Sequence, residues 1–324
     1  MGLGKTVQAL TMLEQYKKTN GELKAVVICP TTLIYNWQNE VKKFTPGLTF
    51  HVHHGNARLR NELELTKHNI IITTYGTLRS DITLFLKVLF DYVVLDESQA
   101  IKNPSSKVTK AATLLTAKNR LCMSGTPLQN NTFDVFAQMN FLNPGLLGSM
   151  EFFRNEFATP IDKFGEPEQK EHLRKLLYPF ILRRTKEQVA KDLPEKTETI
   201  LFCEMEQEQR TIYDAYRNSY RDKILGTIDE QGIEKSQLTI LQGLMKLRQI
   251  CDSPAILNEE EKYPNHSIKL DELAREIAEN IGQHKALIFS QFLGMLSLIR
   301  EKLIEQNIPF EYFDGSTSAT DREK

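Results

Sequence analysis

Four short apolar runs in the first half of the chain constrain its fold more than any other feature. They are rich in Val and Ile and cover residues 24–29 (KAVVIC), 69–73 (NIIIT), 92–96 (YVVLD) and 120–124 (RLCMS). Such runs are typical of strands that are buried on both faces of a parallel sheet. Helical patterns separate them, and residues 7–18 place Val7, Leu10 and Leu13 on one side. The alternation predicts an α/β fold with a doubly wound parallel sheet, whose ligands collect at the carboxyl ends of the strands.

The second half of the chain is mainly helical in pattern. Helical periods cover residues 132–179, with breaks at 143–145 and 165–167, and then residues 206–252. Tyr213, Tyr216 and Tyr220 follow Ile212 at helical spacing, which indicates either packed core or a base-stacking surface, and core is favoured. Near the end, residues 286–290 (ALIFS), a helix near 293–306 and residues 310–313 resemble the opening of a second α/β domain.

Composition limits the partners that this chain can have. Lys plus Arg (41) and Asp plus Glu (42) nearly cancel, so any attraction to nucleic acid must come from local charge. No apolar run approaches the length of a membrane span, and no signal peptide opens the sequence, so no membrane partner is expected. The cysteines lie far apart without metal-ligand spacing, which favours four reduced thiols: Cys29, Cys122, Cys203 and Cys251.

A phosphate-binding loop is indicated at the start of the chain. Gly4-Lys5-Thr6 comes directly before the helical pattern of residues 7–18. Backbone N–H groups at a helix start attract phosphate, a Lys reaches the outer phosphates, and a Thr hydroxyl can ligate Mg²⁺. The three residues alone are weak evidence, because the complete pattern includes another Gly five residues before Gly4.

Two further segments at the ends of apolar runs carry candidate chemistry. Asp96 and Glu97 end one run, where adjacent carboxylates would hold Mg²⁺ and orient the attacking water; the alternative is a solvated acidic turn. Ser124 opens the segment SGTPLQN after another run, where small hydroxyl residues sense a γ-phosphate, although the string alone also fits a turn before a helix. His51-Val52-His53-His54 favours strand alternation plus a turn over a metal site.

The order of these motifs resembles the Swi/Snf-type branch of helicase superfamily two, the ATP-driven motors of chromatin remodellers and their bacterial relatives. The resemblance spans the whole chain and rests on eight or so ordered segments: MGLGKT, PTTLIYNWQNE from Pro30 to Glu40, TTY from Thr73 to Tyr75, DESQAIKN from Asp96 to Asn103, SGTPLQN from Ser124, LRRTK from Leu182 with LPEK from residue 193, LRQIC from Leu247 with IFSQF from Ile288, and DGST from Asp314. Ser98 and Gln99 stand where the family's acidic box has Ala-His, a form associated with some bacterial members.

The resemblance implies a RecA-like doubly wound lobe, helical insertions and the beginning of a second RecA-like lobe. It divides the chain into a first ATP-binding lobe without its first strand (residues 1–131), a helical insertion (132–180), a basic inter-lobe linker (181–200), a second helical insertion (201–266) and the start of the second lobe (267–324). It also implies a translocase on double-stranded DNA that hydrolyses ATP with Mg²⁺, in a bacterial cytoplasm at the nucleoid, or in a nucleus if the source is eukaryotic. Nucleoprotein and RNA polymerase are further partners of this class.

The same resemblance assigns the site residues. ATP would be bound by Gly2, Leu3, Gly4, Lys5 and Thr6. Catalysis is assigned to Lys5, Asp96 and Glu97, with Mg²⁺ held by Thr6 and Asp96. Coupling is assigned to Gln99, Ser124, Gly125 and Thr126. The DNA track is implied at Thr31, Trp37, Thr74, Tyr75, Asn103, Arg183, Arg184, Ser290, Gln291 and Gly315, with contacts to phosphates that specify no sequence.

Charge distribution and the two ends of the chain complete the expectations. Basic residues gather at Lys102, Lys107, Lys110, Lys118 and Arg120, and again at Lys170, Arg174, Lys175, Arg183, Arg184 and Lys186; charge counts alone favour a solvated face, and the resemblance favours phosphate contacts. The family's pattern extends beyond both ends, including a second-lobe arginine finger. The alternative function is therefore a truncated fragment that binds DNA weakly without hydrolysing ATP.

Overall fold

The computed structural model describes residues 2–125, 132–192, 194, 196–231, 233–257, 263–282 and 284–317. The chain forms two compact units, Met1–Pro194 and Glu195–Lys324. The division falls within the segment expected to link two lobes, and the five-part domain division itself stays a prediction.

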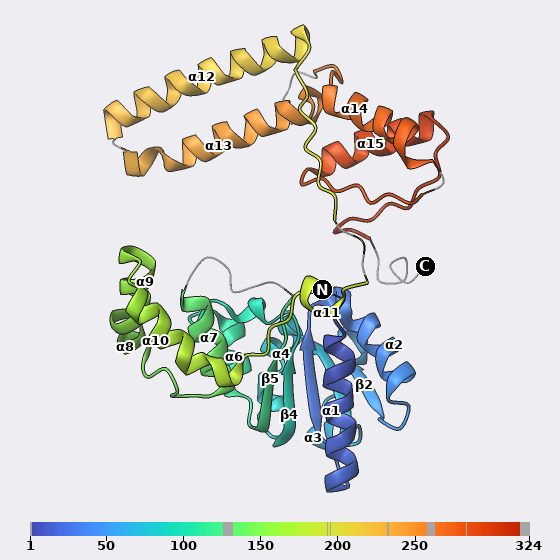
Figure 1. Cartoon of the computed structure of the whole chain (residues 1–324), viewed down its shortest axis with the longest axis vertical. Helices are drawn as coiled ribbons and strands as arrows, with labels where there is room; N and C mark the ends of the chain where they lie inside the picture. Colours follow the sequence, from blue (N-terminus) through green and yellow to red (C-terminus); the bar gives the residue numbers. More distant parts are fainter. Residues whose placement is uncertain are drawn as a thin grey trace. The chain divides into compact units, whose positions relative to one another are not determined.

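The first unit is built on a five-stranded sheet in which every paired strand is parallel, in the order β2-β3-β1-β4-β5 (Figure 1). Its strands are β1 (Ala25–Cys29), β2 (Phe50–His53), β3 (Ile70–Thr74), β4 (Phe90–Leu95) and β5 (Ala117–Cys122). The four expected apolar runs all form strands, and the histidine alternation forms β2. The α/β class with a doubly wound parallel sheet is therefore confirmed.

Helices cover both faces of this sheet, as the apolar composition of its strands requires. They are α1 (Lys5–Asn20), α2 (Ile34–Phe44), α3 (Glu62–Thr66), α4 (Tyr75–Ser80), α5 (Ile82–Phe85) and α6 (Lys107–Leu114), with 3₁₀ turns at Thr31–Leu33, Gly55–Ala57 and Ser98–Ile101. Alternate residues of β1 face opposite cores. Val26 and Ile28 pack with Phe85 and Phe90, while Val27 packs with α1 and α2.

A helical segment follows the sheet within the first unit. It comprises α7 (Thr132–Leu142), α8 (Met150–Phe153), a π turn (Arg154–Ala158), α9 (Thr159–Phe164) and α10 (Pro167–Leu177), then a 3₁₀ turn (Tyr178–Phe180) and α11 (Lys186–Val189). The helices break where the sequence predicts, and Gly165 ends α9 with a positive φ of 67°. Phe136, Phe153 and Phe157 form the centre of their small core.

The second unit is helical throughout its described secondary structure. It contains α12 (Gln207–Gln231), α13 (Ile233–Asp252), a 3₁₀ turn (Pro254–Ile256), α14 (Ile268–Glu276), a π turn (Ile277–Ile281) and α15 (Leu293–Glu305). The strands expected at residues 286–290 and 310–313 are not formed among the described residues. Leu287 and Phe289 are 85% and 87% exposed, since the described part of this unit gives them no neighbouring strand to pair with.

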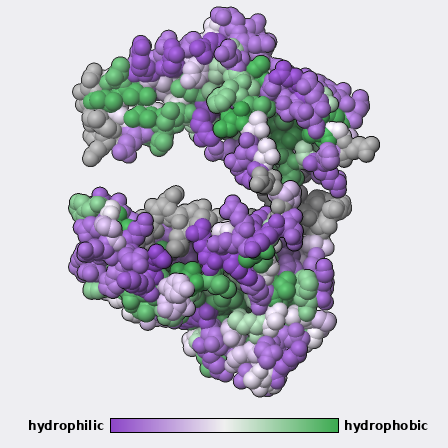
Figure 2. All heavy atoms as spheres, in the orientation of Figure 1, coloured by the Kyte–Doolittle hydropathy of each residue, from purple (hydrophilic) through white to green (hydrophobic). Residues whose placement is uncertain are grey.

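Tyr213, Tyr216 and Tyr220 of α12 are half-buried, and two of them contact residues from other segments. The Tyr216 and Tyr263 hydroxyls lie 3.3 Å apart, and Gly243 admits the ring of Tyr220 at close range. Figure 2 shows hydrophobic side chains on α12 and α13 among hydrophilic ones, and the exposed ones on α13 are Leu238, Leu241, Leu244 and Met245. None of the described helices is both long and apolar enough to cross a membrane.

Candidate nucleotide site and its surroundings

The glycine-rich segment at the start of the chain forms a tight entry to α1. Gly2 and Gly4 have positive φ angles of 76° and 72°, a conformation that side chains with a Cβ rarely adopt. Gly4 stands at the N-cap, and its carbonyl accepts the first helical hydrogen bond, from Gln8 N at 3.0 Å. Unpaired N–H groups at the start of this 16-residue helix are suited to bind phosphate oxygens.

Asp96 follows β4 and is held rigidly although it is buried. Its Oδ2 accepts a hydrogen bond from Trp37 Nε1 at 2.9 Å, and its Oδ1 accepts one from Glu97 N at 2.9 Å. Its backbone carbonyl accepts a third bond from the Tyr75 hydroxyl at 2.8 Å. Burial raises the pKa of Asp96, while the Trp37 hydrogen bond and the positive charge of Lys5 act to lower it. Lys5 and Asp96, separate in sequence, are therefore neighbours in the fold.

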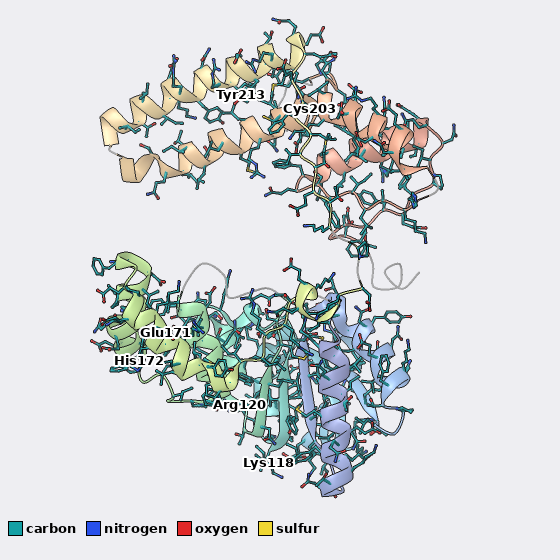
Figure 3. All side chains as sticks on the ribbon, in the orientation of Figure 1. Lys118, Arg120, Glu171, His172, Cys203 and Tyr213 are labelled. Atoms are coloured by element: carbon teal, nitrogen blue, oxygen red, sulfur yellow. The ribbon has the colours of Figure 1, made fainter. Side chains whose placement is uncertain are left out.

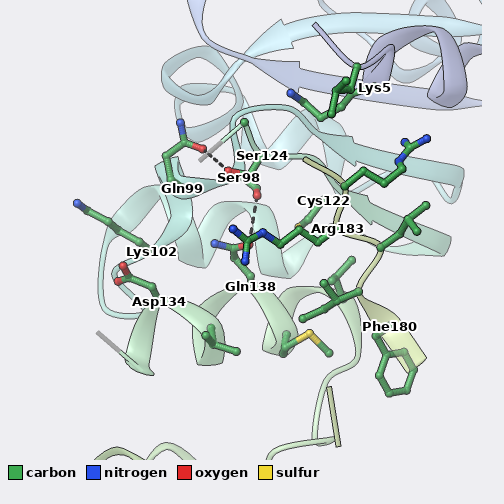
Figure 4. A pocket seen from close by; sticks show the side chains of 18 of the residues that line it. Lys5, Ser98, Gln99, Lys102, Cys122, Ser124, Asp134, Gln138, Phe180 and Arg183 are labelled. Carbon is green, nitrogen blue, oxygen red and sulfur yellow. Dashed lines mark hydrogen bonds between the residues drawn. The ribbon is translucent and has the colours of Figure 1, made fainter. Parts of the chain in front are cut away.

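Glu97 occupies a strained position directly after Asp96. Its φ is +49°, which is uncommon for a residue with a side chain and costs on the order of 1 kcal/mol. Gln99 Nε2 donates to Glu97 Oε2 at 2.7 Å, and Ser124 Oγ donates to Gln99 Oε1 at 3.1 Å (Figure 4). The acidic pair after β4 is therefore connected to the segment after β5, and Ser98 adds a bond to Gln138 on α7 at 3.3 Å.

Thr6 and Glu40 form an acceptor-rich corner beside Asp96. The Thr6 hydroxyl lies near the Glu40 carboxylate and acts to lower the pKa of Glu40. Burial and the negative charge of Asp96 both raise the pKa of Glu40. Hydroxyl and carboxylate oxygens are the ligands that Mg²⁺ prefers, and carboxylates with raised pKa values gain most from a nearby cation. Thr6 and Asp96 thus fit the ion that the sequence implies, and Glu40 lies next to both.

A cavity of about 540 Å³ lies at this edge of the first unit. Lys5, Gln99, Ser124 and Gly125 line it, and so does Leu3. Figure 4 shows Lys5, Gln99 and Ser124 around this space. The structure therefore brings together the phosphate loop and the segment after β5. Thr126 lies outside the described residues.

A second cavity, of about 380 Å³, lies at the ends of β1 and β3. Thr31 and Thr74 line it, together with His54 and Arg58. Arg58 is held by Asp81, which accepts from its Nε at 2.7 Å. The Thr74 hydroxyl accepts from Thr77 N at 3.1 Å and caps α4, so the Thr31 hydroxyl, the imidazole and the guanidinium are the groups suited to contact a phosphate backbone.

Two residues expected to contact DNA, Trp37 and Tyr75, are instead buried in the structure. Trp37 is 1% exposed, and its indole N–H is used by Asp96. Tyr75 is 8% exposed, and its hydroxyl is used by the Asp96 carbonyl. Neither polar group is available to DNA in this structure, because both donate hydrogen bonds to Asp96. The expectation for these two residues is corrected to positioning of Asp96.

Thr74 is 5% exposed, and the other remaining track residues are accessible or half-buried in their own units. Asn103 is exposed before α6, with its side chain accepting from Ser105 N at 3.0 Å. Arg183 and Arg184 are exposed, and Arg184 Nη2 donates to Gln8 Oε1 on α1 at 2.7 Å. In the second unit Ser290 is half-buried, while Gln291 and Gly315 are exposed; Gln291 accepts a hydrogen bond from Arg248.

The first expected basic patch is reduced by internal contacts. Lys118 Nζ pairs with Asp91 Oδ1 at 2.8 Å, near the start of β5 and so at the edge of the sheet opposite the nucleotide site (Figure 3). Arg120 donates to the carbonyls of Phe141 and Leu115 at 2.6 and 2.7 Å. These two cations stabilise the fold, and the exposed cations Lys102, Lys107 and Lys110 remain for phosphate contacts.

Each histidine of residues 51–54 has its own hydrogen-bond partner. His51 contacts the Ala57 carbonyl at 2.8 Å, His53 the Asp81 carboxylate at 2.8 Å, and His54 the Thr77 hydroxyl at 3.0 Å. The described residues contain no group of three or more His, Cys, Asp or Glu side chains placed to hold a metal ion.

Comparison with known proteins identifies the family. The model of the SNF2-related domain matches residues 1–256. The chain belongs to the SNF2-related family. An uncharacterized ATP-dependent helicase of Mycoplasma pneumoniae is 35% identical over 99% of this chain, which covers 30% of that protein. The TATA-binding protein-associated factor MOT1 of Saccharomyces cerevisiae is 30% identical over the whole chain, which covers 21% of it.

A solved structure supports the same assignment. The SWI2/SNF2 ATPase core of Sulfolobus solfataricus in complex with double-stranded DNA is 38% identical, with a TM-score of 0.58; the match covers all of this chain and 68% of that one. This chain spans about a third or less of the curated relatives just named. This SNF2-related chain therefore has the fold of that ATPase core and belongs to the Swi/Snf family of helicase superfamily two.

Three contributions in this SNF2-related chain were missed by sequence reasoning. Glu40 ends the segment PTTLIYNWQNE, which by itself predicts no role for it, although its carboxylate lies near Thr6 and Asp96. His54 and Arg58 line the second cavity beside Thr31 and Thr74. The sequence contains a signal for these two residues, because Arg58 follows the histidine run that ends at His54. Only the fold brings Arg58 to the cavity at the end of β3.

Proposed function

We propose that this chain is the core of an ATP-hydrolysing motor that acts on double-stranded DNA. One observation carries the proposal: Asp96 is buried and fixed beside Lys5, and the adjacent Glu97 connects through Gln99 to Ser124. A phosphate loop, a metal-binding carboxylate, a water-orienting carboxylate and a sensor hydroxyl are the parts that phosphoryl transfer to water needs.

Each residue would have a defined role. The N–H groups before α1 and the Lys5 ammonium would bind the β- and γ-phosphates. Thr6 and Asp96 would hold Mg²⁺, which when bound neutralises phosphate charge. Glu97 would accept a proton from the attacking water, and its strained backbone would hold the carboxylate toward the site.

Duplex DNA is proposed as the second substrate. The support comes from the groove of Thr31, Thr74, His54 and Arg58, and from the solved relative in complex with double-stranded DNA. Phosphate contacts of this kind would be independent of sequence and weaken with salt. Nucleoprotein is a further proposed partner, since a relative is named for association with TATA-binding protein.

A steady-state ATPase assay with and without duplex DNA tests the proposal. Glu97→Gln should lower DNA-stimulated turnover by roughly a hundredfold or more, because the variant cannot accept the proton, while Mg·ATP affinity stays within about twofold. Glu62→Gln is the matched control, an exposed glutamate on α3. Turnover that DNA does not stimulate, or that Glu97→Gln leaves intact, would refute the assignment. Duplex binding without turnover above background would favour a chain that only binds DNA.

A further inference from the structure

The linker after α10 lies against the nucleotide cavity, a position that its expected role in DNA binding does not explain. Residues from Phe180 to Lys186 all line the same cavity as Lys5 and Ser124. Figure 4 shows Arg183 at this cavity, together with Lys5 and Ser124. The segment therefore lines the same pocket as Leu3 and Lys5 of the phosphate loop.

A hydrogen bond attaches this linker to the helix that begins at the phosphate loop. Arg184 Nη2 donates to Gln8 Oε1 at 2.7 Å, and Gln8 is in the first turn of α1. On the other side, Thr185 caps α11 in a reciprocal capping box with Gln188. Arg183 is thus fixed between an anchored neighbour and a capped helix start, which limits where its side chain can reach.

The charge of the cavity wall favours an anion. Five cationic side chains line the cavity, Lys5, Lys102, Arg183, Arg184 and Lys186, against one acidic side chain, Asp134. Within the described part of the chain, neither Lys5 nor Arg183 takes part in an ion pair. A guanidinium pairs well with phosphate through two parallel N–H bonds. A volume of about 540 Å³ is within the range of small-molecule sites.

We propose that Arg183 binds the phosphates of the nucleotide from the linker side, with Arg184 as the positioning residue that holds the linker on Gln8. The inference rests on the proposed nucleotide site and adds a ligand-binding residue to it. Because the same segment continues out of the first unit at Pro194, bound nucleotide would fix the start of the connection between the two units.

Titration of the chain with a fluorescent ATP analogue, followed by competition with ATP and with adenosine, tests the proposal. Arg183→Gln should weaken ATP about tenfold, the effect of losing one charge-assisted contact, and leave adenosine unchanged. Arg183→Lys should recover part of the loss because it keeps the charge. Arg60→Gln is the matched control, since Arg60 is exposed and does not line this cavity.

Lys5→Ala distinguishes a failure of the Arg183 contact from a failure of the proposed nucleotide site. If Lys5→Ala weakens ATP strongly and Arg183→Gln does not, the linker contact is wrong and the nucleotide site stands. If Lys5→Ala binds ATP as the unaltered chain does, the proposed site itself is wrong. If Arg183→Gln weakens duplex DNA and leaves ATP unchanged, Arg183 is a DNA contact only, which also overturns the inference.

Discussion

Replacing Trp37 with Phe gives the sharpest test of how Asp96 is held. The change removes the indole N–H that donates to Asp96 Oδ2 at 2.9 Å and leaves a ring in the same core. A buried hydrogen bond to a carboxylate contributes about 2 kcal/mol, and the smaller ring loses about 1 kcal/mol of packing. We therefore expect the first unit to lose about 3 kcal/mol of stability, which corresponds to roughly hundredfold faster amide exchange in β1 and β4.

Hydrogen–deuterium exchange of the β1 and β4 amides is the appropriate assay, because it reports the first unit separately from the second. The chain contains one Trp, so fluorescence would lose its probe in this variant. A double-mutant cycle with Asp96→Asn isolates the hydrogen bond: the two changes should be non-additive by about 1 kcal/mol, the difference between a charged and a neutral acceptor. Additive effects, or reduced DNA affinity with unchanged exchange, would refute the positioning role and restore Trp37 to the DNA track.

Two other substitutions test internal contacts. Arg120→Met should destabilise the first unit by about 2 kcal/mol in the same exchange assay, because the Phe141 and Leu115 carbonyls lose their donors, and should leave DNA affinity and its salt dependence unchanged; a lower salt dependence would contradict this. Burial lowers the pKa of His53, against the opposing effect of Asp81, so the folded chain binds fewer protons than the unfolded chain just below about pH 6.5, and stability falls as the pH drops through that region. His53→Gln should make the loss of thermal stability between about pH 7.5 and pH 5.5 smaller than in the unaltered chain, and an equal loss would contradict the assignment.

The sequence predicts the sheet well because its strands are apolar on both faces. Val26 and Val27 enter different cores, so no polar alternation marks the strand, and the continuous run is itself the signal. Strand ends are less well predicted: β5 begins at Ala117, where polar residues already pair with β4. The strands expected after α14 are not formed among the described residues, since an apolar run forms a strand only if another strand pairs with it.

The sequence predicts which residues belong to the site better than it predicts where their side chains point. The residue types that place Trp37 and Tyr75 in family motifs do not determine whether the rings face DNA or the core. That choice depends on α2 and α4 packing against the sheet so that both polar groups point at Asp96. Arg120 shows the same limit, because a basic residue in a charge count has no partner until α7 brings the Phe141 carbonyl to it.

The two corrected residues link the proposed DNA groove to the proposed metal ligand. Thr74 lines the second cavity, and the next residue, Tyr75, bonds the Asp96 carbonyl. Thr31 lines the same cavity, and the helix that follows it carries Trp37 to the Asp96 carboxylate. A phosphate bound at Thr31 and Thr74 would therefore contact the two segments that carry Trp37 and Tyr75, the residues that orient Asp96. Coupling between DNA and hydrolysis needs a physical connection of this kind, and here two short ones converge on a single buried carboxylate.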